Sequence, residues 1–235
     1  MSHEPSVPHT IFLLSPANAS GTRGRMVMSE RATFPIAEAL RSRDGAPICD
    51  VFSFVSGLYF RGKLAYARAF ADPPDVARPG VFVITPAAGL RSADTHVTLD
   101  ALRAFAMVDV AADNPAYRRP LEQSAHALAG DIGAECRVVL LGSIASPKYV
   151  DVLLAIFGER LMFPGAFVGR GDMSRGGLLL RAVAEAQELP YIPVVGAVRH
   201  GQRPPKLDPR TRPAAAARGP GIRVGRARAR RTRPA

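Results

Sequence analysis

Six short hydrophobic runs, each followed by a loop rich in Gly, Ser, Pro or Arg, constrain the fold of this chain most strongly. They cover residues 10–14, 51–55, 81–84, 137–141, 161–163 and 191–195. Continuous apolar runs of this length are typical of strands that are buried on both faces of a parallel sheet. The segments between them have the length and apolar spacing of helices. The pattern predicts an α/β fold with a doubly wound, mostly parallel sheet.

The expected helices cover about residues 29–43, 61–71, 99–105, 115–132, 147–157 and 176–188. A chain of 235 residues accommodates one α/β domain of ordinary size with an appendage. We expect a flexible N-terminus over residues 1–9, a single domain over 10–198, and a separate segment over 199–235.

The positive charge of the chain is confined to its C-terminal segment. Residues 199–235 hold twelve of the 31 Lys and Arg residues but one of the 20 acidic residues, so they carry the whole formal charge of +11. This Arg-, Pro- and Ala-rich segment lacks apolar periodicity and is predicted to be disordered. A flexible polycation can hold nucleic acid through counterion release. The alternative is a low-complexity extension without a function.

Cysteine content and hydropathy indicate the compartment. Cys49 and Cys136 are the two cysteines of the chain, and both are expected to be core thiols in a reducing environment. No apolar run approaches the ~20 residues that span a bilayer, and the N-terminus lacks the pattern of a signal peptide. We therefore expect a cytoplasmic protein with no membrane partner. The oligomeric state stays open.

Two cations, Arg61 and Lys63, are expected at the start of the helix over 61–71. Cations at this end of a helix oppose the helix dipole, and an anionic ligand would compensate them. The alternative is that both side chains reach solvent or pair with a carboxylate.

The loop over residues 169–177 contains glycines next to Arg170 and Arg175, which flank Asp172 and Ser174. Glycine permits close approach of the backbone to a ligand, and the loop follows the expected strand over 161–163. This composition favours an anion site. The alternative is a turn held by an Arg170–Asp172 ion pair.

Several common motifs are absent. The chain has no Gly-x-x-x-x-Gly-Lys-Ser/Thr loop, no Gly-x-Gly-x-x-Gly after the first strand and no Gly-x-Ser-x-Gly elbow. Its five histidines are scattered without the spacing of metal ligands. We therefore expect neither a bound metal nor a cofactor.

Four short segments, residues 13–17, 56–59, 138–149 and 170–175, resemble the YaaA-type peroxide-stress protein family and a related bacterial and phage domain of unknown function. They contain Ser-Pro-Ala after the first strand, Ser-Gly-Leu-Tyr, a strand followed by Ser146 and Tyr149, and an Arg-Gly-x-Met-Ser-Arg run. The resemblance implies an α/β fold and DNA binding linked to oxidative damage. The helix-hairpin-helix-like element of that family has no visible counterpart here.

These observations predict a DNA-binding or nucleotide- and phosphate-binding protein with its site at the carboxyl ends of the strands. The expected ligand residues are Ser15, Tyr59, Arg61, Lys63, Gly142, Tyr149, Arg170, Ser174 and Arg175. One alternative is an enzyme that acts on a small phosphorylated or carboxylated metabolite, with Asp172 as acid or base. Another is a non-catalytic interaction module that uses the basic tail. Whether the chain is an enzyme stays open.

Overall fold

A six-stranded sheet forms the centre of the computed structural model, which describes residues 8–145, 147–205 and 207. The strands are β1 (Thr10–Leu14), β3 (Val81–Thr85), β4 (Gly89–Ser92), β6 (Arg137–Leu141), β7 (Leu161–Pro164) and β8 (Tyr191–Pro193). Their order is β4-β3-β1-β6-β7-β8; the four inner strands are parallel, and the two edge strands are antiparallel to their neighbours. The predicted α/β class and mostly parallel sheet are confirmed.

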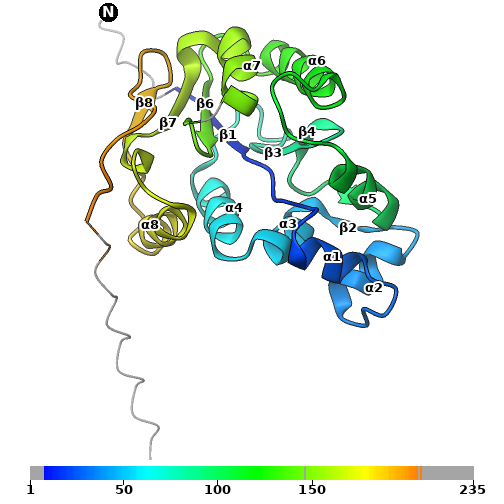
Figure 1. Ribbon diagram of the computed structural model, residues 1–235. Helices are drawn as coiled ribbons and strands as arrows, with labels where there is room; N and C mark the ends of the chain where they lie inside the picture. The colour runs from blue at the N-terminus through cyan, green and yellow to red at the C-terminus, as the bar shows by residue number, and fades with distance from the viewer. Residues whose placement is uncertain (1–7, 146, 206, 208–235) are drawn as a thin grey trace, which may run out of the picture.

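Helices cover both faces of this sheet (Figure 1). On one face lie α6 (Pro115–Asp131) and α7 (Pro147–Phe157), and on the other lie α4 (Leu58–Phe70) and α8 (Asp172–Ala184). All five residues of β1 are buried, as expected for a strand between two helical layers. The sheet is therefore doubly wound, as predicted.

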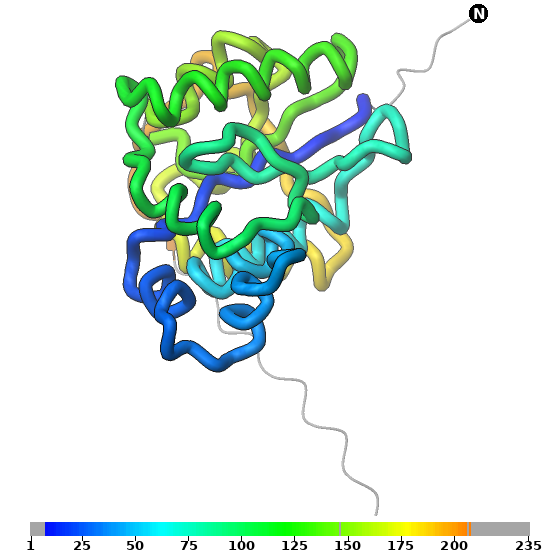
Figure 2. The backbone as a smooth tube through the Cα atoms, turned by 90° about the vertical axis from the view of Figure 1, so that its right-hand side faces the viewer, coloured from blue at the N-terminus to red at the C-terminus, as the bar shows by residue number. Residues whose placement is uncertain are grey.

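A smaller group of elements extends from the carboxyl ends of the inner strands. It contains α1 (Thr22–Met28), α2 (Pro35–Arg41), α3 (Ile48–Ser56), α5 (Leu99–Met107) and a two-stranded ladder of β2 (Ala46–Pro47) with β5 (His96–Val97). Figure 2 shows α6 along the upper side of the molecule and α1 and α2 at its lower side. This group forms one wall of the cleft described below.

The strand predicted over residues 51–55 is wrong, because this run lies inside α3. Val51, Phe52 and Val55 are buried at the spacing of three and four residues that one helix face requires. The apolar run that suggested a strand is thus the buried face of a helix. The sixth strand is instead β4, which forms a hairpin with β3.

Several predicted helix bounds also need correction. The helix expected over 29–43 is the shorter α2, with Pro35 in its first turn, and α1 lies before residue 29, where no helix was expected. Both α4 and α8 begin before the predicted residue. Arg61, Lys63 and Arg175 therefore lie inside helices rather than at their first residues, and α4 follows α3 rather than a strand.

The C-terminal residues that the structure describes lie against the domain. The Arg199 guanidinium is 3.2 Å from the Asp151 carboxylate, and the Pro205 carbonyl accepts a hydrogen bond from Arg170 at 3.3 Å. The predicted disordered tail falls mainly on residues from 208 onward, outside the described residues. Among the helices that are described, none has the length and apolar character needed to cross a bilayer.

Candidate ligand-binding cleft

The order of the strands creates a switch point between β1 and β6. From β1 the chain crosses to β3 on one side, and it later returns to β6 on the other side. Leu14 pairs with Leu141, so Ser15 and Gly142 leave the sheet side by side. In open α/β sheets, ligands bind in the crevice at such a point.

A cleft of about 680 Å³ lies at this switch point. Residues from the carboxyl ends of three parallel strands line it: Ser15 after β1, Pro86 after β3 and Ser143 after β6. The helix-start residues Lys148 and Asp172 line it as well. Its remaining walls are residues 16–20, Ser56, Tyr59, Tyr149 and the segment 105–110 at the end of α5. The volume is in the range of about 300–1,000 Å³ that small-molecule sites occupy.

Lys63 lies buried behind this cleft, with 1% of its surface exposed. Its Nζ donates hydrogen bonds to the carbonyl oxygen of Ser15 at 2.7 Å and to Ser15 Oγ at 2.9 Å. The ammonium group also lies over the rings of Tyr59 and Phe60, at 4.6 and 4.9 Å from their centroids. Helix α4 thus fixes an amine against the hydroxyl at the end of β1.

Burial lowers the pKa of Lys63 from 10.5 to about 7. The Asp172 carboxylate acts against this decrease, and the Arg175 guanidinium adds to it. Near neutral pH the amine is therefore present in both its neutral and its protonated form. A neutral lysine amine can accept a proton, which an ordinary surface lysine does not do at this pH.

The two tyrosines of the cleft differ in their hydrogen bonds. The Tyr149 hydroxyl accepts from the Ser143 amide at 3.1 Å and donates to the Ser143 carbonyl at 3.0 Å. The buried Tyr59 hydroxyl donates no hydrogen bond within the described part of the chain, and the Arg175 guanidinium acts on its oxygen as a donor. Burial raises the pKa of both phenols, and nearby Arg175 opposes the increase. A buried hydroxyl in a cleft wall whose proton has no acceptor is a natural donor for a ligand oxygen.

Gly142 is required by the close approach of β6 and β1 at this point. A Cβ atom on Gly142 would lie 2.9 Å from both Ser15 Cβ and the Tyr149 hydroxyl, and 3.2 Å from Ser15 Oγ. Any larger residue would therefore occupy the space next to the Ser15 hydroxyl. The glycine keeps that hydroxyl accessible from the cleft.

Arg175 and Asp172 occupy adjacent turns of α8 but differ in burial. Arg175 is 8% exposed, and its Nε and Nη2 atoms both donate to the Phe167 carbonyl at 3.2 Å. Its Nη1 is 3.4 Å from the Asp172 carboxylate, whose side chain is 68% exposed. Asp172 thus pairs with Arg175 rather than with Arg170, and its exposed carboxylate faces the cleft.

Not every residue predicted for the site reaches the cleft. Arg170 donates to the Ala166 carbonyl at 3.0 Å and to Ser174 Oγ at 3.2 Å, so both side chains belong to the turn before α8. Arg61 is exposed on α4 and does not line the cleft. The structure brings together Ser15, Tyr59, Lys63, Gly142, Tyr149, Asp172 and Arg175.

The sequence interpretation missed part of the lining, including Asn18, Asp109, Ser143 and Lys148. Ser143 and Lys148 closely follow β6, so the rule that ligands bind at the carboxyl ends of strands would have found them. Asp109 lies beyond α5 and far from any strand end in the sequence. Nothing local in the sequence indicates its position.

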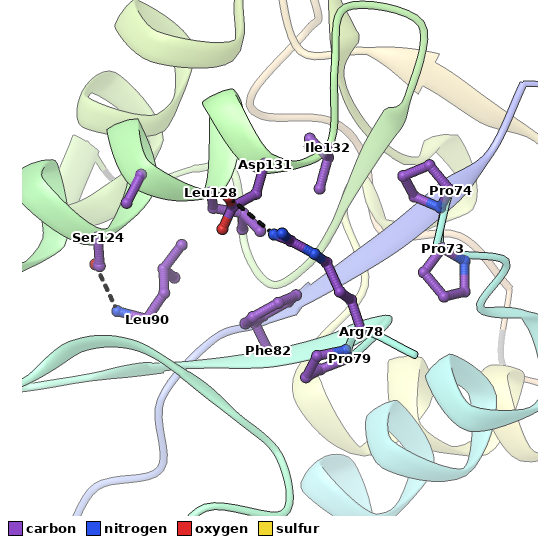
Figure 3. A pocket seen from close by; sticks show the side chains of 11 residues that line it. Pro73, Pro74, Arg78, Pro79, Phe82, Leu90, Ser124, Leu128, Asp131 and Ile132 are labelled. Atoms are coloured by element: carbon purple, nitrogen blue, oxygen red, sulfur yellow. Dashed lines mark hydrogen bonds and ion pairs between the residues drawn. The ribbon is translucent and has the colours of Figure 1, made fainter. Parts of the chain in front are cut away.

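A second pocket, of about 330 Å³, lies between the β3–β4 hairpin and α6 (Figure 3). Phe82, Leu90 and Leu128 supply apolar surface. Its polar side chains already have partners: Arg78 lies 2.8 Å from Asp131, and Ser124 Oγ accepts from the Leu90 amide at 2.8 Å. This pocket therefore offers a ligand less polar recognition than the cleft at the switch point.

Comparison with protein-family models, curated proteins and solved structures finds no match for this chain.

Proposed function

We propose that the cleft between β1 and β6 binds a nucleotide or another phosphorylated molecule of similar size, either free or as part of DNA. The buried Tyr59 hydroxyl in the wall of a cleft at the switch point, whose proton finds no acceptor among the described residues, is the observation that carries this proposal. Leaving a buried donor without an acceptor costs about 1–3 kcal/mol, and a ligand acceptor would recover that cost.

The other groups of the cleft suit the parts of such a ligand. Lys148 and the first turn of α7 place positive charge at one wall, where phosphate oxygens are favoured. Asp109 and Asp172 offer acceptors for hydroxyl or amino groups. The Phe105 ring adds apolar surface for a base or another flat group.

The resemblance to YaaA-type proteins favours a ligand derived from DNA over a free metabolite. A nucleotide within a flexible single strand can enter a cleft of this size, whereas a base inside a duplex must first be extruded. The basic segment from residue 199 onward would add affinity that does not depend on sequence.

The second candidate is an enzyme that acts on a small phosphorylated or carboxylated metabolite in the same cleft. The contact of Lys63 Nζ with Ser15 Oγ favours it, because a buried amine beside a hydroxyl is an arrangement that supports catalysis.

Calorimetric titration of the full chain with 5′-mononucleotides, inorganic phosphate and a short single-stranded oligonucleotide tests the proposal. At about 0.3 M salt the contribution of counterion release is reduced, so binding in the cleft dominates. We expect saturable binding of one ligand per chain. Tyr59→Phe should weaken it about fivefold, as the loss of one neutral hydrogen bond does.

Lys148→Ala should also weaken binding, whereas Arg118→Ala serves as the matched control. Arg118 is an exposed cation on α6 that pairs with Glu122 and does not line the cleft. Equal affinities of the wild type, Tyr59→Phe and Lys148→Ala would overturn the proposal, as would a lack of saturable binding by any of the three probes. Binding of the oligonucleotide without binding of mononucleotides would identify DNA as the ligand source.

A further inference from the structure

We propose that Ser15 is a nucleophile and that Lys63 is its general base, so that the cleft hydrolyses an activated acyl group such as an ester or thioester. The proposal rests on the cleft being a ligand site, as above, but not on the ligand being a nucleotide. It goes further by assigning a reaction to two residues that the fold brings together.

The first support is the geometry of the pair. Lys63 Nζ lies 2.9 Å from Ser15 Oγ, which is within the range for proton transfer between a nucleophile and its base. The 2.7 Å hydrogen bond from Nζ to the Ser15 carbonyl fixes the amine. In its neutral form, the amine can keep that donation and use its lone pair to accept the Ser15 hydroxyl proton.

The second support is the location of the hydroxyl. Ser15 lies directly after β1 at the switch point and lines the cleft, while Gly142 leaves space beside its Oγ. A ligand in the cleft can therefore reach the hydroxyl through the space beside Gly142. Serine and lysine form such nucleophile pairs on unrelated folds, which are recognised by geometry and not by sequence position.

The third support is the protonation state of the amine. Burial lowers the pKa of Lys63 to about 7, so a substantial fraction is neutral at neutral pH. The charged and titratable groups that face it are Asp172 and Arg175 of α8 and the Tyr59 phenol of α4. A base whose pKa lies near the working pH is the most effective.

The charge requirement of the reaction favours an acyl group over a phosphoryl group. Phosphoryl transfer distributes charge over three oxygens and uses several cations as clamps. Attack on a carbonyl carbon develops charge on one oxygen, which one or two donors stabilise. The Tyr59 hydroxyl of the cleft wall, which donates to no group among the residues that the structure describes, supplies such a donor.

The reaction balances with water as the only co-reactant. Ser15 Oγ forms a bond to the carbonyl carbon, its proton passes to neutral Lys63, and the π electrons move to the carbonyl oxygen. The bond to the leaving alcohol or thiol then breaks, and the leaving group takes the proton from Lys63. Water attacks the acyl-serine, gives a proton to Lys63, and the carbon–Oγ bond breaks as Oγ regains a proton. The products are a carboxylic acid and the alcohol or thiol.

A fluorophosphonate probe tests the nucleophile on the full chain, because Ser15 Oγ would displace fluoride, HF would leave, and the chain would gain the probe mass less that of HF. We expect one adduct, which peptide mapping places on Ser15, with a labelling rate that increases with pH through an inflection near 7. Ser15→Ala should abolish the adduct. The matched control, Ser42→Ala, removes an exposed hydroxyl that follows α2 and does not line the cleft, so it should leave the labelling unchanged.

Lys63→Arg tests whether Lys63 accepts the Ser15 proton or only holds Ser15 in place by donating hydrogen bonds. Arginine retains a cation and hydrogen-bond donors but cannot act as a base. If Lys63 is the base, labelling of Ser15 in Lys63→Arg should fall about 100-fold or more. Full labelling of this variant would overturn the assignment of Lys63, and absence of labelling of the wild type between pH 6 and 9 would overturn that of Ser15.

Two further measurements complete the test. With 4-nitrophenyl acetate, we expect an acetyl adduct on Ser15 followed by its hydrolysis; labelling by the fluorophosphonate without acetylation would overturn the acyl class. Nucleotide binding by Ser15→Ala separates the two proposals. If the wild type binds nucleotides but is not labelled, only the assignment of the nucleophile is contradicted. If the wild type is labelled but binds no nucleotide, only the function proposed above is contradicted.

Discussion

Gly62 of α4 lies directly against Gly176 of α8, so closely that a Cβ atom on Gly62 would be 2.8 Å from the Gly176 carbonyl oxygen. In the reverse direction, a Cβ atom on Gly176 would be 3.0 Å from the Cα of Tyr59. This contact between two backbones allows α4 and α8 to pack side by side on one face of the sheet. It places Lys63 and Tyr59 next to Arg175 and Asp172.

We expect Gly62→Ala to lower the free energy of unfolding by about 1–3 kcal/mol, the usual cost of overpacking. The nearest atoms belong to backbone, which cannot move as a flexible side chain can. Thermal or urea unfolding measures the change. The matched control is Gly130→Ala in α6, where a Cβ atom meets nothing within 4 Å.

Alanine stabilises a helix interior by roughly 0.5–1 kcal/mol relative to glycine, so the Gly130 variant should be at least as stable as the wild type. Equal stability of the Gly62 and Gly130 variants would contradict the tight contact between α4 and α8.

The pKa of Lys63 gives a prediction for the pH dependence of stability. Its pKa is about 7 in the folded chain and 10.5 in the unfolded chain, so between these values the unfolded chain binds more protons. The free energy of unfolding should therefore increase as the pH rises from about 7 toward 10.5, and the penalty is fully present below pH 7.

Chemical denaturation of the wild type and Lys63→Met between pH 6 and 9.5 measures this contribution. Methionine fills a similar volume but does not titrate, so the variant should lack the increase. The variant should gain stability relative to the wild type toward pH 6. A difference between the two proteins that does not change with pH would show that Lys63 keeps an ordinary pKa.

Arg175→Ala should destabilise the domain by about 1–3 kcal/mol, because it leaves the Phe167 carbonyl without two charged donors. Asp172→Asn removes the carboxylate that pairs with the same guanidinium, but Asp172 is exposed. Its effect should stay within the 0.2–1 kcal/mol range, roughly, of exposed ion pairs. Melting temperatures of both variants check this order. Unchanged stability of Arg175→Ala would instead favour a guanidinium that is available to a ligand.

Two truncations separate the folded domain from the basic segment. A chain ending at residue 207 keeps the contacts of Arg199 with Asp151 and of Pro205 with Arg170, and its melting temperature should equal that of the full chain. A chain ending at residue 198 loses both contacts and should melt at a lower temperature. Identical melting of all three chains would show that residues 199–207 contribute nothing to stability.

The truncation at residue 207 also tests the charge of the C-terminal segment in DNA binding. If this segment contacts phosphates, its removal should reduce the slope of log affinity against log salt by about 0.9 for each phosphate that it neutralises. The slope is measured with a duplex oligonucleotide between about 50 and 200 mM salt. An unchanged slope would show that the segment does not contact DNA.

The sequence by itself determined the fold class and most of the sheet. The runs in β1, β3, β6 and β7 are continuous and apolar, and each is buried between helices as that pattern predicts. Helices α6 and α7 also lie where their spacing places them. These features depend on short-range periodicity, which a sequence displays directly.

Local periodicity does not distinguish a strand from a helix when the apolar run is short. Residues 51–55 suit a buried strand or a buried helix face equally well, and the choice of α3 depends on packing against α4 and α1. Arg61 and Lys63 are two positions apart in α4 and therefore lie on different sides of the helix, so Arg61 is exposed although its sequence position suggested a shared role.

Only the tertiary structure decided which predicted site residues meet. Ser15 and Lys63 are 48 positions apart, and their contact requires both the β1–β6 pairing and the position of α4 under β1. The burial that lowers the pKa of Lys63 results from α8 packing against α4 through Gly62 and Gly176. Local sequence sets the conformation of each helix and strand. Which side chains come into contact, and how their pKa values change, depends on the burial of surface between elements that are distant in the sequence.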